Sequence, residues 1–112
     1  MPGIFLSTTH PPDNTMTPTA TPRIDADRLW KSLMDLAQIG ATPKGGVRRI
    51  ALTDEDRQGR EQVARWCREA GLDVRVDEVG NLFARRPGLD PSARAVATGS
   101  HIDTQPSGGK FD

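Results

Sequence analysis

The residues best suited to chemistry lie close to the C-terminal end of this 112-residue sequence. His101 and Asp103 are two positions apart, so in an extended segment their side chains point to the same side. The carboxylate can then hold the imidazole in one tautomer while the other ring nitrogen faces a metal ion. Asp112 follows a glycine-rich turn that can bring its carboxylate back beside His101 to bridge two cations. The pattern predicts half of a dinuclear hydrolytic metal centre, since such a site needs further His, Glu or Asp ligands.

Two other catalytic interpretations are disfavoured by the same residues. Ser100 is unsuited as a nucleophile, because adjacent strand residues project to opposite faces and its proton could not easily pass to His101. A phosphate-binding loop at 108–110 would need an earlier glycine where Thr104 stands and a Ser or Thr where Phe111 stands. Metal binding is therefore the preferred chemistry for this segment.

Three basic residues are candidates for binding an anionic substrate. Lys44 lies within a loop rich in chain-breaking residues and Arg48 and Arg49 follow it; guanidinium groups form paired hydrogen bonds with carboxylates. Isolated charges of this kind are more often solvated surface groups. We therefore expect ordinary solvated charge at all three positions.

Composition excludes several classes of partner. The formal net charge is zero with both signs interspersed, which disfavours nucleic acid and anionic membranes and favours small molecules or another protein chain. The single cysteine, Cys67, excludes an internal disulfide and is expected to be a buried structural thiol. No segment resembles a signal peptide or a membrane span, so a cytoplasmic location is expected.

The chain is expected to divide into a leader and part of one domain. Residues 1–22 are rich in Pro and Thr and predict a disordered leader, in which His10 lacks the rigid support of a metal ligand and Met16 is an alternative start. Residues 23–112 predict the N-terminal portion of a catalytic domain. A domain that stops at a candidate ligand, Asp112, is interpreted as truncated.

Two helices are predicted from caps and periodicity. Asp25 is a suitable cap for a helix over about 26–39, with apolar residues recurring on one face and Gly40 as a stop. Thr53 precedes an acidic first turn and begins a second helix that closes at Gly71. Trp30 in the first helix and Trp66 in the second are expected to be core or interface aromatics.

A hairpin and a buried strand are predicted to follow. Residues 72–77 alternate between apolar and charged side chains, and the Gly80-Asn81 turn precedes a second extended run over 82–84. Residues 95–97 form a short apolar run typical of a central strand buried on both faces. His101 would then lie at the C-terminal end of that strand, where ligands collect in open α/β sheets.

These motifs closely resemble the N-carbamoyl-L-amino acid hydrolase, β-ureidopropionase and allantoate amidohydrolase family. The resemblance covers roughly residues 25–112 and implies an α/β class, as the N-terminal part of a zinc aminopeptidase-like α/β/α catalytic domain. The matching segments are 39–42, 45–47, 52–57, 70–72, 77–82, 99–104 and 108–112.

By position, the resemblance implies that His101 and Asp112 are metal ligands, with Asp112 bridging two divalent ions. Asp103 would have the catalytic role of orienting His101. The ions would be Zn or Mn, with Co or Ni as other options, and the intact protein would be a homodimer. The activity implied is hydrolysis of a linear C–N bond in N-carbamoyl amino acids, allantoate or ureidopropionate. The remaining ligands and the general base would lie beyond Asp112, so the fragment alone is expected to be inactive.

Two alternatives to this assignment stay open. One is a dipeptidase or an N-acyl amino acid deacylase of the same superfamily, which the Gly-Gly-Lys-Phe-Asp ending at 108–112 disfavours. The other is a non-catalytic truncated product that at most binds metal weakly or associates with an intact subunit.

Overall fold

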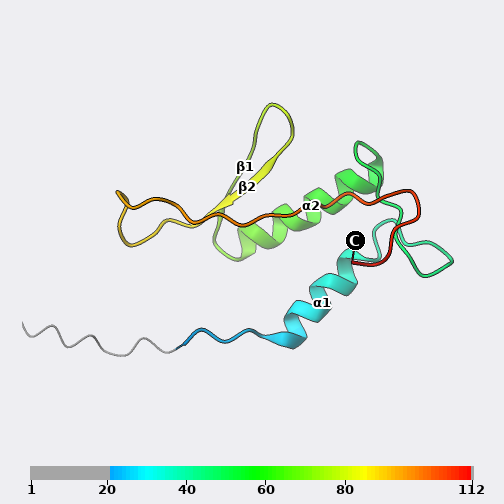
Figure 1. Ribbon diagram of the computed structural model, residues 1–112, viewed down its shortest axis with the longest axis horizontal. Helices are drawn as coiled ribbons and strands as arrows, with labels where there is room; N and C mark the ends of the chain where they lie inside the picture. Colours follow the sequence, from blue (N-terminus) through cyan, green and yellow to red (C-terminus); the bar gives the residue numbers. More distant parts are fainter. Residues whose placement is uncertain (1–20, 112) are drawn as a thin grey trace, which may run out of the picture.

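The structure is a computed structural model that describes residues 21–111 of the chain. It contains helix α1 (Ala26–Leu36), helix α2 (Asp54–Glu69) and strands β1 (Asp73–Val76) and β2 (Leu82–Arg85). Figure 1 shows these elements in chain order, followed by a long segment that returns past α2. The α/β class and the order of two helices and a hairpin are confirmed. The leader predicted at 1–22 lies outside the described residues except for its last two positions.

Helix α1 begins where the sequence predicts. The Asp25 carboxylate accepts a hydrogen bond from the Arg28 amide at 2.9 Å, which satisfies an amide that the first helical turn leaves free. The helix ends at Leu36, three residues earlier than predicted, because the chain turns at 37–40 and Gly40 adopts a φ of +83°. The apolar face is mostly exposed, with Leu29 and Trp30 at 50% and 57%. This face of α1 is therefore only partly covered within the described residues.

Helix α2 also begins at its predicted cap. The Thr53 hydroxyl accepts from the Asp56 amide, and the Asp56 carboxylate accepts in return from the Leu52 amide at 3.0 Å. These bonds satisfy one amide in the first turn of the helix and one just before its cap, in a variant of the capping box. The helix ends at Glu69, and Gly71 follows in the left-handed conformation. Cys67 is a free, half-buried thiol on this helix.

The predicted hairpin is confirmed as an antiparallel pair. Its register joins Asp73 to Arg85 and Val76 to Leu82, and α2 packs against both strands. The connection at 77–81 is organised by Asp77, whose carboxylate accepts from the Val79 amide and from both the amide and the side chain of Asn81. The sequence therefore identified the turn but not the acid that stabilises it.

The predicted central strand at 95–97 is not formed. All of 93–100 is exposed and unassigned to any strand, and Val96 is fully exposed. An interior strand requires hydrogen-bonded neighbours on both sides, and the part of the chain that the structure describes places none beside this segment. The prediction failed because an apolar run specifies burial only when other strands are present to cover it.

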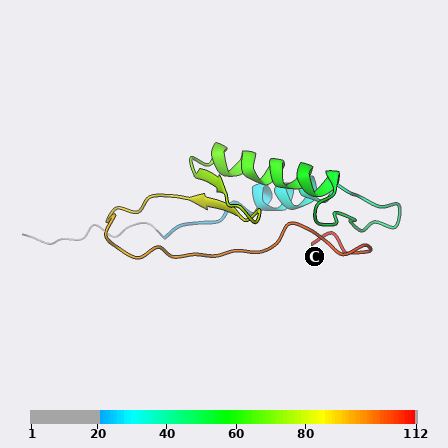
Figure 2. The same ribbon diagram turned by 90° about the horizontal axis from the view of Figure 1, so that it is seen from above.

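The last described residues return to the middle of the molecule. Figures 1 and 2 show the chain leaving β2, turning, and running back along the length of the molecule, apart from α2 in Figure 2, until its red end lies near α1. Val47 is fully buried there and forms isolated bridges to Ala41 and Gly108. Among the described residues, buried polar side chains are as prominent as buried apolar ones: Arg49, Asp56 and Thr104 join Ala37, Val47 and Ala64. Within 21–111, none of the helices has the length and apolar character needed to cross a membrane.

Candidate metal centre

His101 is held with one ring nitrogen occupied and the other free. Its Nδ1 lies 2.7 Å from the main-chain oxygen of Asp103 and 3.4 Å from that residue's carboxylate oxygen. A carbonyl oxygen can only accept, so in the neutral ring Nδ1 carries the proton and Nε2 keeps its lone pair. The imidazole is 61% exposed, and Nε2 has no hydrogen-bond partner among residues 21–111. This is the tautomer that a metal ligand requires.

Asp103 orients His101 mainly through its backbone. The sequence pattern predicted that the carboxylate would hold the ring, but the main-chain carbonyl is the closer acceptor. The carboxylate remains 45% exposed on the same side of the segment as the imidazole. Asp103 can therefore fix the tautomer through its main-chain oxygen, while its partly exposed carboxylate lies beside Nδ1.

The described residues supply only part of a metal-binding shell. Asp112 lies outside them, and within 21–111 no group of three or more His, Cys, Asp and Glu side chains gathers around one point. A catalytic zinc ion normally takes three protein ligands. His101 fits such a site as one neutral nitrogen ligand, and the other ligands have to come from outside the described residues.

Arg49 is a buried residue that the sequence analysis assigned wrongly. Its side chain is almost inaccessible, whereas Arg48 and Lys44 are exposed as predicted. Its Nε donates to the Ile102 carbonyl at 2.8 Å, and its Nη1 donates to the carbonyls of Leu36 and Ile39 at 3.0 and 2.8 Å. These last two carbonyls lie at the C-terminal end of α1, where a cation also complements the helix dipole. The guanidinium thus joins α1 to the segment that carries His101.

Thr104 joins the segment that carries His101 to the main chain of Arg49. Its hydroxyl accepts from the Arg49 amide at 2.8 Å, and its own amide donates to the Arg49 carbonyl at 2.7 Å. Thr104 is buried, and its hydroxyl proton can be donated to the carbonyl of Gln105 at 3.1 Å. Residues 49 and 104 are therefore paired through both main chain and side chain, across 55 positions of sequence.

Helix α2 makes room for this cluster with a glycine. A Cβ atom on Gly59 would lie 2.6 Å from Arg49 Cδ and 3.3 Å from Ile102 Cγ2. Desolvation lowers the pKa of Arg49, and the nearby carboxylates of Asp56 and Asp103 raise it in opposition. The guanidinium remains charged, because arginine titrates far above neutral pH.

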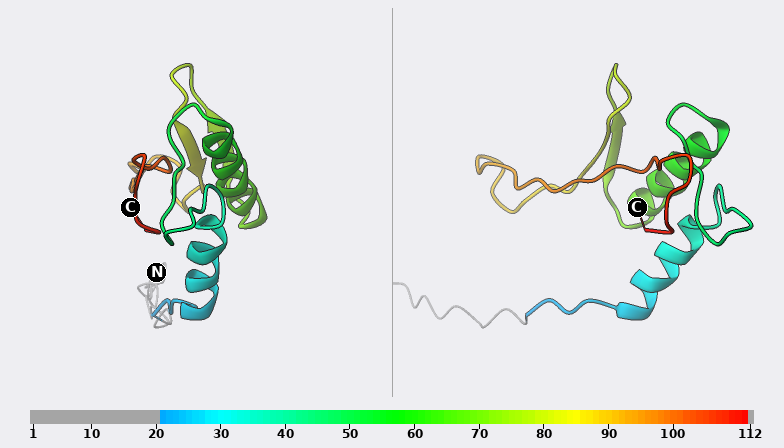
Figure 3. Two further views of the ribbon diagram at one scale, coloured as in Figure 1. Left: turned by 90° about the vertical axis from the view of Figure 1, so that its right-hand side faces the viewer. Right: turned by 45° about the vertical axis from the view of Figure 1, so that its right-hand side comes forward.

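The end of the described chain is held by two further contacts. The Val47 amide donates to the Gly108 carbonyl at 3.1 Å, and a Cβ on Gly46 would collide with that same carbonyl oxygen. The Phe111 ring lies 5.7 Å from the ring of Trp30 in a tilted arrangement, which brings the chain back to α1. The right-hand view of Figure 3 shows the end of the red segment near the C-terminal end of α1. Trp30 is thus a contact aromatic, although it stays half exposed.

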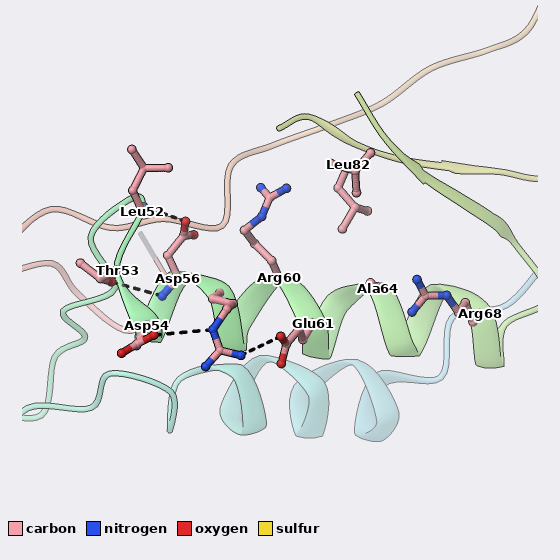
Figure 4. A pocket seen from close by; sticks show the side chains of 11 residues that line it. Leu52, Thr53, Asp54, Asp56, Arg60, Glu61, Ala64, Arg68 and Leu82 are labelled. Atoms are coloured by element: carbon pink, nitrogen blue, oxygen red, sulfur yellow. Dashed lines mark hydrogen bonds and ion pairs between the residues drawn. The ribbon is translucent and has the colours of Figure 1, made fainter. Parts of the chain in front are cut away.

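An open groove lies elsewhere, along α2. It has a volume of about 540 Å³ and extends from the cap of α2 to the hairpin. Figure 4 shows Arg60 projecting from α2 between Leu52 and Leu82. Neither His101 nor Asp103 lines this groove. The groove and the candidate metal ligand are therefore separate features.

Comparisons with known proteins agree with the resemblance seen in the sequence. No family model matches the chain. An N-carbamoyl-L-amino-acid amidohydrolase from Rhizobium meliloti is 56% identical over 90 residues, covering 80% of this chain and 22% of that protein. A ureidoglycolate hydrolase from Arabidopsis thaliana is 43% identical over 89 residues, covering 80% of this chain and 19% of that protein.

The solved structures define the same class. A crystal structure of a hydantoinase/carbamoylase family amidase from Burkholderia ambifaria matches with 66% identity and a TM-score of 0.77, covering 80% of this chain and 22% of that one. The chain is therefore a homologue of the hydantoinase/carbamoylase amidases. Within that class, the predicted resemblance to N-carbamoyl-L-amino acid hydrolases is confirmed. The chain spans about 22% of the length of these curated relatives.

Proposed function

We propose that the intact protein is a metal-dependent amidohydrolase that cleaves a linear C–N bond in N-carbamoyl amino acids or related ureido compounds such as allantoate and ureidopropionate. The observation that carries this proposal is the 56% identity over 90 residues to an enzyme named for that activity. The exposed His101, with its free Nε2, supports a metal site in the same protein.

In this mechanism the residues of the chain hold the metal ions and orient the His101 ring. His101 would donate Nε2 to one of two divalent ions, Zn or Mn, and Asp112 would supply the shared carboxylate. When bound, the ions polarise the scissile carbonyl and lower the pKa of a bound water. The backbone of Asp103 keeps the proton on His101 Nδ1, and its carboxylate adds negative charge beside the ring. A cytoplasmic homodimer that acts on small molecules completes the proposal.

A substrate panel tests the reaction class. The intact protein, supplied with Mn²⁺ or Zn²⁺, should release ammonia from N-carbamoyl-L-amino acids. Ureidoglycolate and allantoate belong in the same panel because a ureidoglycolate hydrolase is among the relatives. Dipeptides and N-acyl amino acids serve as comparison substrates. Turnover of these last two classes without turnover of any ureido compound would overturn the proposal.

The role of His101 is tested by replacing it with alanine. His101→Ala should lower metal-dependent turnover by at least about 100-fold, because a lost nitrogen ligand leaves the ion more hydrated and less fixed. Gln105→Ala is a matched control, since Gln105 is exposed and close in sequence. The measurements are turnover and metal content after dialysis. Wild-type metal content and turnover in His101→Ala would refute the assignment.

A further inference from the structure

The segment 101–104 alternates between anchored and free residues. The Ile102 carbonyl and the Thr104 hydroxyl and amide are bonded to Arg49, and the Ile102 side chain packs near Gly59. His101 and Asp103, at the alternate positions, keep their side chains partly exposed. One side of the segment is therefore fixed to the scaffold while the other presents an imidazole and a carboxylate.

From this arrangement we propose that Arg49 and Thr104 are positioning residues for His101, holding the backbone whose Asp103 carbonyl sets the imidazole tautomer. The inference rests on the proposed function, because it assumes that His101 binds a metal ion. Neither residue touches the metal or the substrate in this scheme. They act through the main chain of residues 102–104.

The chemistry of the anchor suits this role. The guanidinium directs several N–H groups in a rigid fork, and here one side chain reaches three carbonyls on two separate segments. An apolar contact would stabilise the segment without fixing its register, because the hydrophobic effect is non-directional. Hydrogen bonds of Arg49 and Thr104 instead fix the position of the main chain at residues 102–104 relative to residue 49. A ligand supported in this way is held within the small tolerance that a catalytic metal site needs.

Two substitutions at Thr104 distinguish the effect of its hydroxyl from the effect of its side-chain volume. Thr104→Val keeps the shape but leaves the Arg49 amide without its acceptor, whereas Thr104→Ser keeps the hydroxyl. In the intact protein, Thr104→Val should weaken Zn²⁺ or Mn²⁺ binding by about 10- to 100-fold, as loss of supporting groups around metal ligands does. Thr104→Ser should restore most of that affinity. Chelator competition measures the affinity directly.

Two further readouts distinguish positioning from a general loss of stability. The ¹⁵N shifts of His101 in the metal-free protein report its tautomer, and Thr104→Val should raise the fraction with the proton on Nε2. Turnover of N-carbamoyl substrate should show a lower kcat with little change in KM. Ala64→Gly is the stability control, because Ala64 is buried on α2 and is not part of the Arg49 cluster. It should lower the melting temperature without altering metal affinity or tautomer.

Arg49→Lys provides a second test that keeps the positive charge. An ammonium group cannot reproduce the fork that reaches Ile102, Leu36 and Ile39, so metal affinity should fall as in Thr104→Val. Wild-type metal affinity and tautomer in both folded variants would overturn the inference. If the wild-type protein binds metal but hydrolyses none of the ureido compounds, the proposed function fails, while affinity and tautomer still decide the role of Arg49 and Thr104.

Discussion

Two consecutive stretches of the chain, 93–100 and 101–104, differ sharply in how they are held. The first is exposed throughout and belongs to no strand. The second contains the buried Thr104 and is bonded to Arg49 by main-chain and side-chain groups. Both stretches contain apolar residues, yet Val96 is fully exposed while Ile102 is half-buried.

The difference shows that order in these two stretches depends on hydrogen bonds with residues distant in the sequence rather than on their own composition. Thr104 contacts residues 55 and 57 positions away, so its position depends on the connection between α1 and α2. Residues 93–100 have no such partner within the described chain. The candidate metal ligand lies at the start of the anchored stretch, next to Ile102, whose carbonyl accepts from Arg49. This placement is expected for a side chain whose function requires a fixed direction.

Removing the side chain of Arg49 should leave residues 101–104 as weakly held as residues 93–100. Of the substitutions considered, it should lower the free energy of unfolding the most. Arg49→Leu leaves the carbonyls of Leu36, Ile39 and Ile102 without their donor, and buried groups left unpaired are costly. We expect the free energy of unfolding to fall by about 3 kcal/mol in urea denaturation. Arg48→Leu is the matched control and should change it by less than about 0.5 kcal/mol, because Arg48 is exposed. Equal effects at both positions would contradict the role of Arg49.

A larger residue at position 59, beside Arg49 and Ile102, should lower the stability by a smaller amount. Gly59→Ala places a Cβ 2.6 Å from Arg49 Cδ, which forces the arginine or Ile102 to move. Overpacking of this kind costs about 1–3 kcal/mol, and the higher helix propensity of alanine offsets up to about 1 kcal/mol of it. A net loss of about 1 kcal/mol is expected from thermal unfolding. Gln58→Ala, on the exposed neighbour, should not destabilise the protein, and a stabilised Gly59→Ala would show that the space is larger than the geometry indicates.

The elements that could be predicted from the sequence are those specified by nearby residues. Asp25 and Thr53 satisfy amides three positions away, so both helix starts are visible in the sequence itself. The hairpin follows from alternation and a turn within thirteen consecutive positions, 73–85. The prediction of a strand at 95–97 was wrong because the stability of a strand depends on neighbouring strands that a local pattern does not specify.

The residue that supports the candidate site, Arg49, makes contacts with residues distant in the sequence, so its role could not be predicted from the sequence. Arginine is rarely buried, so the sequence favoured a solvated Arg49. Its burial follows from three carbonyls that become available only when the end of α1 meets residue 102. One signal was present: Gly59 interrupts a helix otherwise free of glycine, which indicates a close approach by another group. The pairing of His101 with Asp103 was predictable because it is local, although the carbonyl rather than the carboxylate makes the closer contact.

The smallest predicted effect concerns the local turn that precedes the exposed stretch. Asp90 accepts from the hydroxyl of Ser92 at 2.7 Å and from its amide at 2.9 Å, and these bonds, the hydroxyl first, hold the pKa of its carboxyl below the usual value. Because the folded pKa is lowered, the stabilisation is present above the unfolded pKa and is lost as the pH falls through the folded one. We therefore expect the Ser92 amide to exchange faster with solvent as the pH drops below about 4, once the intrinsic pH dependence is corrected.

Ser92→Ala tests whether this turn is independent of the anchored stretch. The substitution removes the hydroxyl donor, so the pKa of Asp90 should rise toward its ordinary value in an NMR titration. The Thr104 amide, bonded to Arg49 across the molecule, should keep its protection from exchange in the same variant. A simultaneous loss at Thr104 would mean that 93–100 transmits order between the two sites, and the contrast between local and distant support would fail. Retained protection would show that the contacts of Thr104 with Arg49 and Val47 hold the segment bearing His101 without support from the turn at 90–92.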